Sequence, residues 1–408
     1  MKLMLKGGGG LLLVFLIAAG YWYYRPGSEF SPREVIEMSS LEDRRRSYRM
    51  METVYPSSPI AAPRLRTAFA RDLVDLDLRY EWLGQPRTFD DYIDQRKVQG
   101  ILVLKDGVVR YERFFGEAEP DDRFTSWSVA KSVVATLIGI ALGEGRIGSL
   151  DDRVSQYASE YEETDYGDTS IRHLLMMSSG IDFNENYEEP GADIRKLFFN
   201  TFLLNRDVDR VVRQFTRNRP AGEDFDYISS NTQVLSAVLR GAYDRPLIET
   251  MNEKLSIPLG LTGGSWLTDR QGAAKKELGY CCLQLTLEDY AKLGQLYVQD
   301  GVVGETRIIP EGWRSFVSTP PRASHKPKGE GRLGYGHHFW LIGGQPGSFT
   351  MQGYDGQYVH IDPAERVVIV IASADRTMDF TKPREFPPLF KRIKEELRST
   401  EASLASGN

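Results

Sequence analysis

The sequence predicts an α+β fold whose central antiparallel sheet is built from both ends of one domain and is flanked by helices. Residues 101–111 form two apolar, β-branched runs around an Asp-Gly pair, a strong signal for a two-residue hairpin. A second pair of apolar runs, at 357–363 and 367–371, lies near the other end of the chain. The stretch between these hairpins is mainly helical in its apolar pattern. We therefore expect a helical subdomain, at about 133–280, inserted between the strands.

The segments before and after this domain have different compositions. Residues 26–63 are rich in charge and proline, and we interpret them as a tether or linker. The main domain is expected over 64–398 and closes with a helix at 388–398. Residues 399–408 are expected to form a disordered tail. The helices predicted within the domain cover 133–142, 171–177, 208–215, 232–239 and 288–298.

The first 25 residues have the pattern of a membrane anchor. Lys2 and Lys6 precede an uncharged stretch, 7–24, with an apolar centre and an aromatic end. As a helix this stretch reaches about 27 Å, close to the hydrocarbon thickness of a bilayer. The lysines place the N-terminus in the cytoplasm, which predicts a single-pass inner-membrane protein with its remaining residues in the periplasm. The alternative is a signal peptide cleaved near 18–20, which would leave a secreted, periplasmic protein.

Composition excludes several classes of protein. Hydrophobic residues make up 41% and aromatic residues 11% of the 408 residues, too many for a disordered chain. The net charge of −6, without a long basic block, argues against nucleic acid as a partner. Cys281 and Cys282 are the only cysteines, so a disulfide scaffold and a multi-cysteine zinc site are not expected. Because a bond between neighbouring cysteines would be strained, we expect two free or buried thiols.

Ser128 and Lys131 form the motif that carries candidate chemistry, at the start of an apolar helix. Residues three apart share a helix face. A serine hydroxyl becomes a nucleophile when a base removes its proton, and burial can lower a lysine pKa enough for that role. A lysine is costly to bury among apolar residues, so we interpret Ser128 as the nucleophile and Lys131 as its general base. The alternative is an N-capping serine followed by a surface lysine.

This motif and four later segments resemble, in order, the serine β-lactamase-like superfamily of penicillin-binding proteins, class C β-lactamases, esterases and amidases. The resemblance spans about 80–398. It implies a β-lactamase/transpeptidase-like fold and a serine hydrolase that works through an acyl-enzyme, with no cofactor and no metal. The four later segments are 145–154, 171–181, 258–261 and 335–336.

The second motif of that superfamily is Tyr-x-Asn, Tyr-x-Ser or Ser-x-Asn, and two registers fit this chain. One uses Tyr227 and Ser229, and the other uses Ser229 and Asn231. We prefer Tyr227 as the proton relay to the leaving group, because the following helix then falls where it packs in the family. Acid–base transfer of this kind contributes about 100- to 10,000-fold to a rate. Ser229 and Asn231 remain candidate substrate-binding residues.

The third motif is usually Lys-Thr-Gly or His-x-Gly, but here it is Met351-Gln352-Gly353, without its cation. In the family that cation helps to hold the carboxylate of β-lactams and peptides. Its absence argues against hydrolysis of classical β-lactam antibiotics, and the Gly-x-x-Gly-Gln form of 353–357 resembles the 6-aminohexanoate-dimer hydrolase and esterase branch. Arg322 or Arg332, in the preceding loop, is the alternative source of positive charge.

The resemblance also implies an oxyanion hole. Its donors would be the backbone N–H groups of Ser128 and of Tyr354, which follows Gly353, and losing one such donor costs about 2.7–4 kcal/mol. Gln352 and Gln357 are further candidate substrate-binding residues.

Together these features predict a membrane-anchored serine hydrolase that cleaves an ester or amide bond in a small molecule. One alternative is a D,D-peptidase or β-lactamase acting on cell-wall peptides or penicillins. Another is a non-catalytic binding protein that keeps the fold. The segment with Asp182, Glu185 and Tyr187 is expected to be a surface loop, with a role at the substrate entrance as the alternative.

Overall fold

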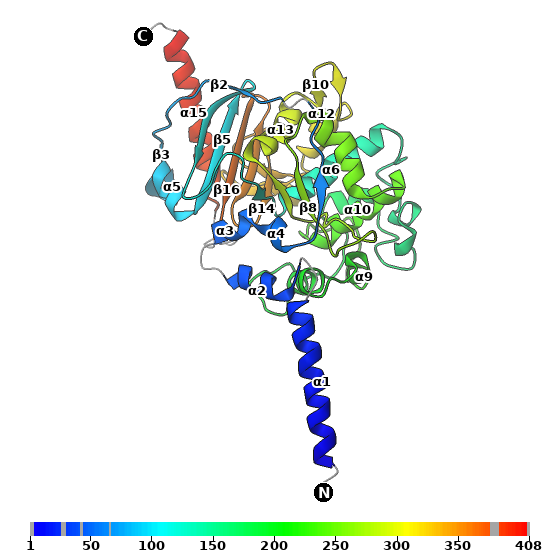
Figure 1. Ribbon diagram of the computed structural model, residues 1–408. Helices are drawn as coiled ribbons and strands as arrows, with labels where there is room; N and C mark the ends of the chain where they lie inside the picture. The colour runs from blue at the N-terminus through cyan, green and yellow to red at the C-terminus, as the bar shows by residue number, and fades with distance from the viewer. Residues whose placement is uncertain (1–3, 26–29, 41–43, 65–66, 376–382, 406–408) are drawn as a thin grey trace.

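The computed structural model describes residues 4–25, 30–40, 44–64, 67–375 and 383–405 (Figure 1). Its centre is an eight-stranded sheet with the strand order β12-β13-β14-β15-β16-β5-β6-β2. Strand β16 pairs antiparallel with β5, so strands from the two ends of the domain meet in the middle of the sheet. The predicted α+β fold is confirmed, with one difference: the edge strand β2 runs parallel to β6. The strands are β2 (Ala70–Arg71), β5 (Val98–Lys105), β6 (Val108–Phe114), β12 (Leu333–Tyr335), β13 (Trp340–Ile342), β14 (Phe349–Gly353), β15 (Gln357–Asp362) and β16 (Val367–Ser373).

The Asp-Gly hairpin forms as the sequence predicts. Asp106 and Gly107 both have positive φ, at 55° and 78°, as a two-residue type I′ turn requires. That turn matches the right-handed twist of β5 and β6, which it connects.

Helices cover both faces of the sheet because its strands are apolar on both sides. Leu102 and Val370 face the core that contains helices α6 (Val129–Gly143) and α13 (Leu287–Val298). Ile101 and Ile371 face the opposite core, with α5 (Phe89–Gln95) and α15 (Phe386–Ala405). Successive side chains along the middle strands therefore alternate between the core on the α6 face and the core on the α15 face.

The helical subdomain lies beside the α6 face, and a four-stranded sheet, β1-β8-β9-β7, lies next to it. Its helices are α7 (Ile171–Leu175), α8 (Asp193–Phe198), α9 (Val208–Val212), α10 (Ser229–Tyr243), α11 (Leu247–Met251) and α12 (Ile257–Leu259). The small sheet consists of β1 (Ser57–Ile60), β7 (Phe124–Thr125), β8 (Gly264–Leu267) and β9 (Leu283–Leu285). The other strands and the other α-helix described within the domain are β3 (Arg79–Trp82), β4 (Gln85–Thr88), β10 (Val302–Val303), β11 (Thr306–Arg307) and α14 (Trp313–Val317).

The predicted linker at 26–63 is wrong for its described residues, which fold onto the domain. They form α2 (Pro32–Ser40), α3 (Arg44–Arg49), α4 (Met51–Val54) and strand β1, which pairs with β8. Most of the described apolar side chains that interrupt the charged runs are buried, and this burial holds the segment against the core. The disordered tail predicted over 399–408 is also wrong for residues 399–405, because α15 continues to Ala405.

Helix α1 (Met4–Tyr24) projects away from the body of the protein (Figure 1). The apolar side chains from Leu11 to Ile17 are exposed. Among the residues described, no helix reaches the length and apolarity of a membrane span.

Candidate active site

Ser128 occupies the position immediately before helix α6, which begins at Val129. The helix is apolar on nearly every side because it packs between α10 and strand β14. Ser126 ties the preceding segment to β9: its N–H donates to the carbonyl of Leu283 (2.8 Å), and its Oγ accepts from the N–H of Leu283 (2.9 Å). Trp127, between Ser126 and Ser128, has a φ of 42°, a conformation that non-glycine residues rarely adopt. These constraints fix the backbone that presents Ser128.

Lys131 lies one helical turn further and points back to the serine. Its Nζ donates to Ser128 Oγ at 2.9 Å and to the backbone carbonyl of Tyr280 at 2.8 Å. The side chain is buried, and this burial lowers the pKa of Lys131 to about 8, although the carboxylate of Glu185 acts in the opposite direction. About a tenth of this lysine is therefore uncharged at pH 7.

Tyr227 completes the group. Its ring centroid lies 5.2 Å from Lys131 Nζ, and its hydroxyl shares a hydrogen bond with Ser128. Burial and the charge of Glu185 raise the pKa of Tyr227, while the hydrogen bond to Ser128 acts against them, so the phenol keeps its proton at neutral pH. The structure thus brings together the three residues that the sequence motifs singled out.

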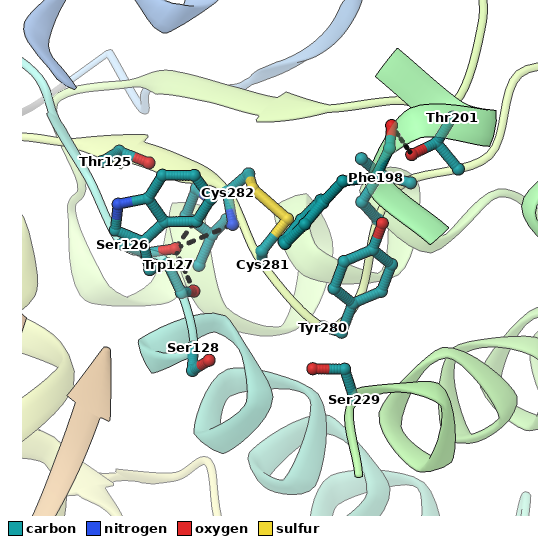
Figure 2. Close-up of a disulfide and its surroundings, with 12 residues drawn as sticks. Thr125, Ser126, Trp127, Ser128, Phe198, Thr201, Ser229, Tyr280, Cys281 and Cys282 are labelled. Carbon is teal, nitrogen blue, oxygen red and sulfur yellow. Dashed lines mark hydrogen bonds between the residues drawn. A yellow bond between two sulfur atoms is a disulfide. The ribbon is translucent and has the colours of Figure 1, made fainter. Parts of the chain in front are cut away.

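In the competing register, Ser229 with Asn231, the two side chains have different surroundings. Asn231 is buried in the helical subdomain, where its Oδ1 accepts from the hydroxyl of Tyr166 at 3.2 Å. Ser229 begins helix α10, and its Oγ donates to Glu185, whose charge acts on Lys131; Figure 2 labels Ser229 and Ser128. Of the two candidate substrate-binding residues, the site thus holds Ser229 and excludes Asn231.

Glu185 is a site residue that the sequence prediction placed on a surface loop. Its carboxylate accepts from the N–H of Ser229 (2.9 Å), from Ser229 Oγ (2.5 Å) and from the hydroxyl of Tyr187 (2.7 Å). Burial raises the pKa of Glu185, whereas the charge of Lys131 lowers it. The ring of Tyr187 in turn stacks on Tyr354, with centroids 4.6 Å apart. The loop therefore closes one side of the site, and a carboxylate and a phenol two residues apart were its signal in the sequence.

The third motif approaches the nucleophile through Gly353, the last residue of β14. A Cβ atom there would lie 2.3 Å from the carbonyl oxygen of Ser126, so only glycine allows this contact. The contact brings the backbone around Tyr354 beside the segment that carries Ser128, where the predicted oxyanion donors would lie.

Of the predicted residues Gln352 and Gln357, the structure turns Gln352 away from the nucleophile, whereas Gln357 lies beside Ser126 and Val129 and binds backbone carbonyls. Gln352 pairs across the sheet with Tyr358, whose ring packs against α15, so strand parity directs Gln352 to the opposite face. The side chain of Gln357 donates to the carbonyl of Ser373 at 2.6 Å and holds the end of the hairpin. Met351, which faces the α6 side, is buried in the core, so the third motif supplies no cation.

The two cysteines are not free thiols as predicted: Cys281 and Cys282 form a disulfide (Figure 2). The expectation of strain assumed an ordinary backbone, but Cys282 lies in a turn with a φ of 80°, which brings the two side chains together. In Figure 2 the disulfide lies between Trp127 and Phe198. The same turn supplies the Tyr280 carbonyl that binds Lys131, and the N–H of Cys282 donates to Ser126 Oγ at 3.1 Å.

The described residues contain no group of three His, Cys, Asp or Glu side chains arranged to hold a metal ion. What the arrangement offers is an activated hydroxyl, a buried amine with a lowered pKa and a protonated phenol. These groups can carry out nucleophilic acyl transfer with general acid–base assistance.

Comparison with known proteins agrees with this architecture. The model of the Beta-lactamase family matches residues 86–386. A 6-aminohexanoate-dimer hydrolase from Paenarthrobacter ureafaciens is 27% identical over 335 residues, which cover 78% of this chain and 80% of the relative. A D-aminopeptidase from Brucella anthropi is 25% identical, over 41% of this chain and 32% of its own length.

A solved structure extends the similarity to the fold. A Bacillus anthracis protein assigned as a 6-aminohexanoate-dimer hydrolase superposes with a TM-score of 0.76 at 21% identity, covering 87% of this chain and 95% of its own. The superfamily predicted from the ordered motifs is confirmed. The chain belongs to the Beta-lactamase family.

Proposed function

We propose that this protein is a serine hydrolase that cleaves amide bonds of small, linear molecules, and reactive esters, through an acyl-enzyme. The observation that carries the proposal is the 2.9 Å contact between Lys131 Nζ and Ser128 Oγ, with the pKa of the lysine lowered by burial. Two relatives are named as a 6-aminohexanoate-dimer hydrolase and a D-aminopeptidase, and both names describe amide cleavage.

In the first step, neutral Lys131 takes the proton of Ser128 while Oγ attacks the substrate carbonyl carbon. The Tyr280 carbonyl binds one N–H of the lysine and thereby turns the amine toward the serine. The carbonyl oxygen becomes an oxyanion. We assign its stabilisation to the N–H groups of Ser128 and Tyr354, supported by the N-terminus of α6.

In the second step, the C–N bond breaks and the leaving nitrogen takes a proton from the hydroxyl of Tyr227. The proton that Lys131 received from the serine then restores the phenol, so the pair passes one proton from nucleophile to leaving group. Water next attacks the acyl-enzyme and transfers a proton to the same pair. The C–O bond to Ser128 then breaks, the pair returns that proton to Ser128 Oγ, and the carboxylic acid leaves. Tyr227 suits this relay because burial keeps its hydroxyl protonated until the leaving group needs it.

Turnover by the full-length protein tests this assignment. A panel of linear amides, p-nitrophenyl esters and nitrocefin is compared for wild type and Ser128→Ala. We expect turnover of linear amides that disappears in Ser128→Ala. Amide turnover that persists in the variant would contradict the role of Ser128.

We also propose that residues 1–25 attach the enzyme to a membrane, with the catalytic domain on the oxidising side. Exposed apolar side chains from Leu11 to Ile17 support attachment. The Cys281–Cys282 disulfide supports an oxidising compartment, where such bonds persist. Alkaline phosphatase fused after residue 64 should be active and should sediment with membranes in an exporting bacterium. An inactive fusion would contradict export, and an active but fully soluble one would contradict attachment.

A further inference from the structure

Helix α3 places Tyr48 between the two segments that carry the assigned oxyanion donors. The ring of Tyr48 packs in a T-shaped arrangement against Trp127, which precedes Ser128, with centroids 5.5 Å apart. The hydroxyl of Tyr48 donates to Oδ2 of Asp355, which follows Tyr354. One buried side chain therefore contacts the residue before the first donor and the residue after the second donor.

The loop at 354–356, which contains the second donor, joins β14 to β15. Asp355 lies in this loop with a φ of 54°, and its carboxylate is buried. Its Oδ2 accepts from Tyr48 and from Arg44 Nη1 at 3.0 Å, whereas its Oδ1 accepts no hydrogen bond from a described residue. Because a buried carboxylate is costly without donors, the two contacts from α3 hold the loop in its place.

Helix α3 is itself fixed to both sheets of the domain. Arg49, at its end, donates to Oε1 of Gln99 in β5 at 2.8 Å. In the next helix, α4, Glu52 accepts from Oγ of Ser265 in β8 at 2.6 Å. Tyr48 therefore projects from a firmly held helix, as a residue that positions other groups must.

We propose that Tyr48 is a positioning residue that sets the separation between the backbone N–H groups of Ser128 and Tyr354. This inference rests on the proposed function, which assigns the oxyanion to those two donors. Each donor must lie about 2.7–3.1 Å from the oxyanion, so even a small shift of the loop at 354–356 weakens the second one. The segment that contains Tyr48 precedes residues 86–386, so this support comes from outside the region that matches the family model.

The test variant is Tyr48→Phe, which removes the hydrogen bond to Asp355 but keeps a ring against Trp127. Thermal unfolding shows whether the variant keeps the stability of the wild type. The matched control is Tyr243→Phe. Tyr243 also donates its hydroxyl to a carboxylate, that of Glu144 at 2.8 Å, but it lies at the end of α10 remote from the site.

The full-length protein is assayed with a linear amide and with a trifluoromethyl ketone, whose hemiketal with Ser128 places an oxyanion at the same donors. Tyr48→Phe should lower kcat and the affinity for the ketone together, by about 10- to 100-fold, and should leave KM nearly unchanged. Complete loss of one oxyanion donor costs about 100- to 1,000-fold, and a displaced donor should cost less. A role in stability alone would lower the unfolding temperature without this split between kcat and KM. Wild-type kcat and ketone affinity in Tyr48→Phe would overturn the positioning role.

Amide hydrogen exchange in the peptide that contains 354–356 separates this proposal from the proposed function. We expect faster exchange there in Tyr48→Phe than in the wild type or in Tyr243→Phe. Absence of Ser128-dependent turnover would contradict the hydrolase, and faster exchange would still support the hold of Tyr48 on the loop. Ser128-dependent turnover and loop exchange that both stay unchanged in Tyr48→Phe would overturn the positioning role and leave the hydrolase standing.

Discussion

Replacing Glu185 with glutamine tests how the buried site sets the basicity of Lys131. Burial lowers the pKa of Lys131 to about 8, and the negative charge of Glu185 holds it above the value that burial alone would give. Glutamine has nearly the same shape and retains an oxygen that can accept from the Ser229 N–H. Glu185→Gln therefore removes the charge while keeping the loop in place, and the pKa of Lys131 should fall.

The sign of the effect on activity follows from the role of the lysine. The neutral amine is the active form, so kcat/KM should rise with pH through about 8 and fall about tenfold per unit below it. With a pKa of 8, about 1% of Lys131 is neutral at pH 6. If the substitution lowers that pKa by one unit, the neutral fraction at pH 6 becomes about 9%, and kcat/KM should rise roughly ninefold. At high pH the plateau should fall slightly, because a less basic amine is a weaker general base.

The assay is the pH profile of kcat/KM from pH 5.5 to 9.5 for a neutral amide, beside thermal unfolding to show that the variant folds. Glu188→Gln is the matched control, since Glu188 is an exposed carboxylate of the same loop. It should leave the acidic limb near pH 8. An acidic limb that stays in place in Glu185→Gln, or moves to higher pH, would refute the electrostatic coupling of Glu185 to Lys131.

Three further predictions concern the relay, the disulfide and the third motif. Tyr227→Phe should lower kcat for amides by about 100- to 10,000-fold but lower that for p-nitrophenyl esters much less, since their leaving group needs no proton; equal losses would contradict the relay. The double substitution Cys281→Ser and Cys282→Ser should reduce kcat more than it raises KM, because the same turn holds the Lys131 acceptor and the Ser126 clamp; an unchanged kcat would contradict this. Nitrocefin should be a poorer substrate in kcat/KM than short p-nitrophenyl esters, because Met351 supplies no cation; faster nitrocefin hydrolysis would show that the carboxylate is held elsewhere.

Local patterns predicted the parts of the fold and site that depend on neighbours in sequence. Ser128 and Lys131 share one helix face, and their spacing alone brings the hydroxyl and the amine together. The two hairpins follow from turn chemistry and β-branched runs, and their pairing gives the sheet built from both ends of the domain.

The predictions that failed depend on long-range contacts and on the alternation of side chains along a strand, which local sequence patterns do not specify. Glu185 reaches the site because its loop folds over the start of α10, 44 residues later in the chain. Gln352 is adjacent to the site in sequence, but alternation along β14 turns it to the other face of the sheet. The segment at 26–63 looked solvated because its apolar residues are scattered among charges. Most of the apolar residues described there are buried against the domain, a long-range contact that local composition does not reveal.

The chemical identity of the nucleophile is the most direct test of the account. Intact protein treated with a fluorophosphonate near pH 8 should gain one adduct, and peptide mass spectrometry should locate it on Ser128. Labelling should slow as the pH falls below the Lys131 pKa of about 8 and should disappear in Ser128→Ala. An adduct on a different serine, or labelling of Ser128 with no dependence on pH around 8, would contradict a nucleophile activated by Lys131.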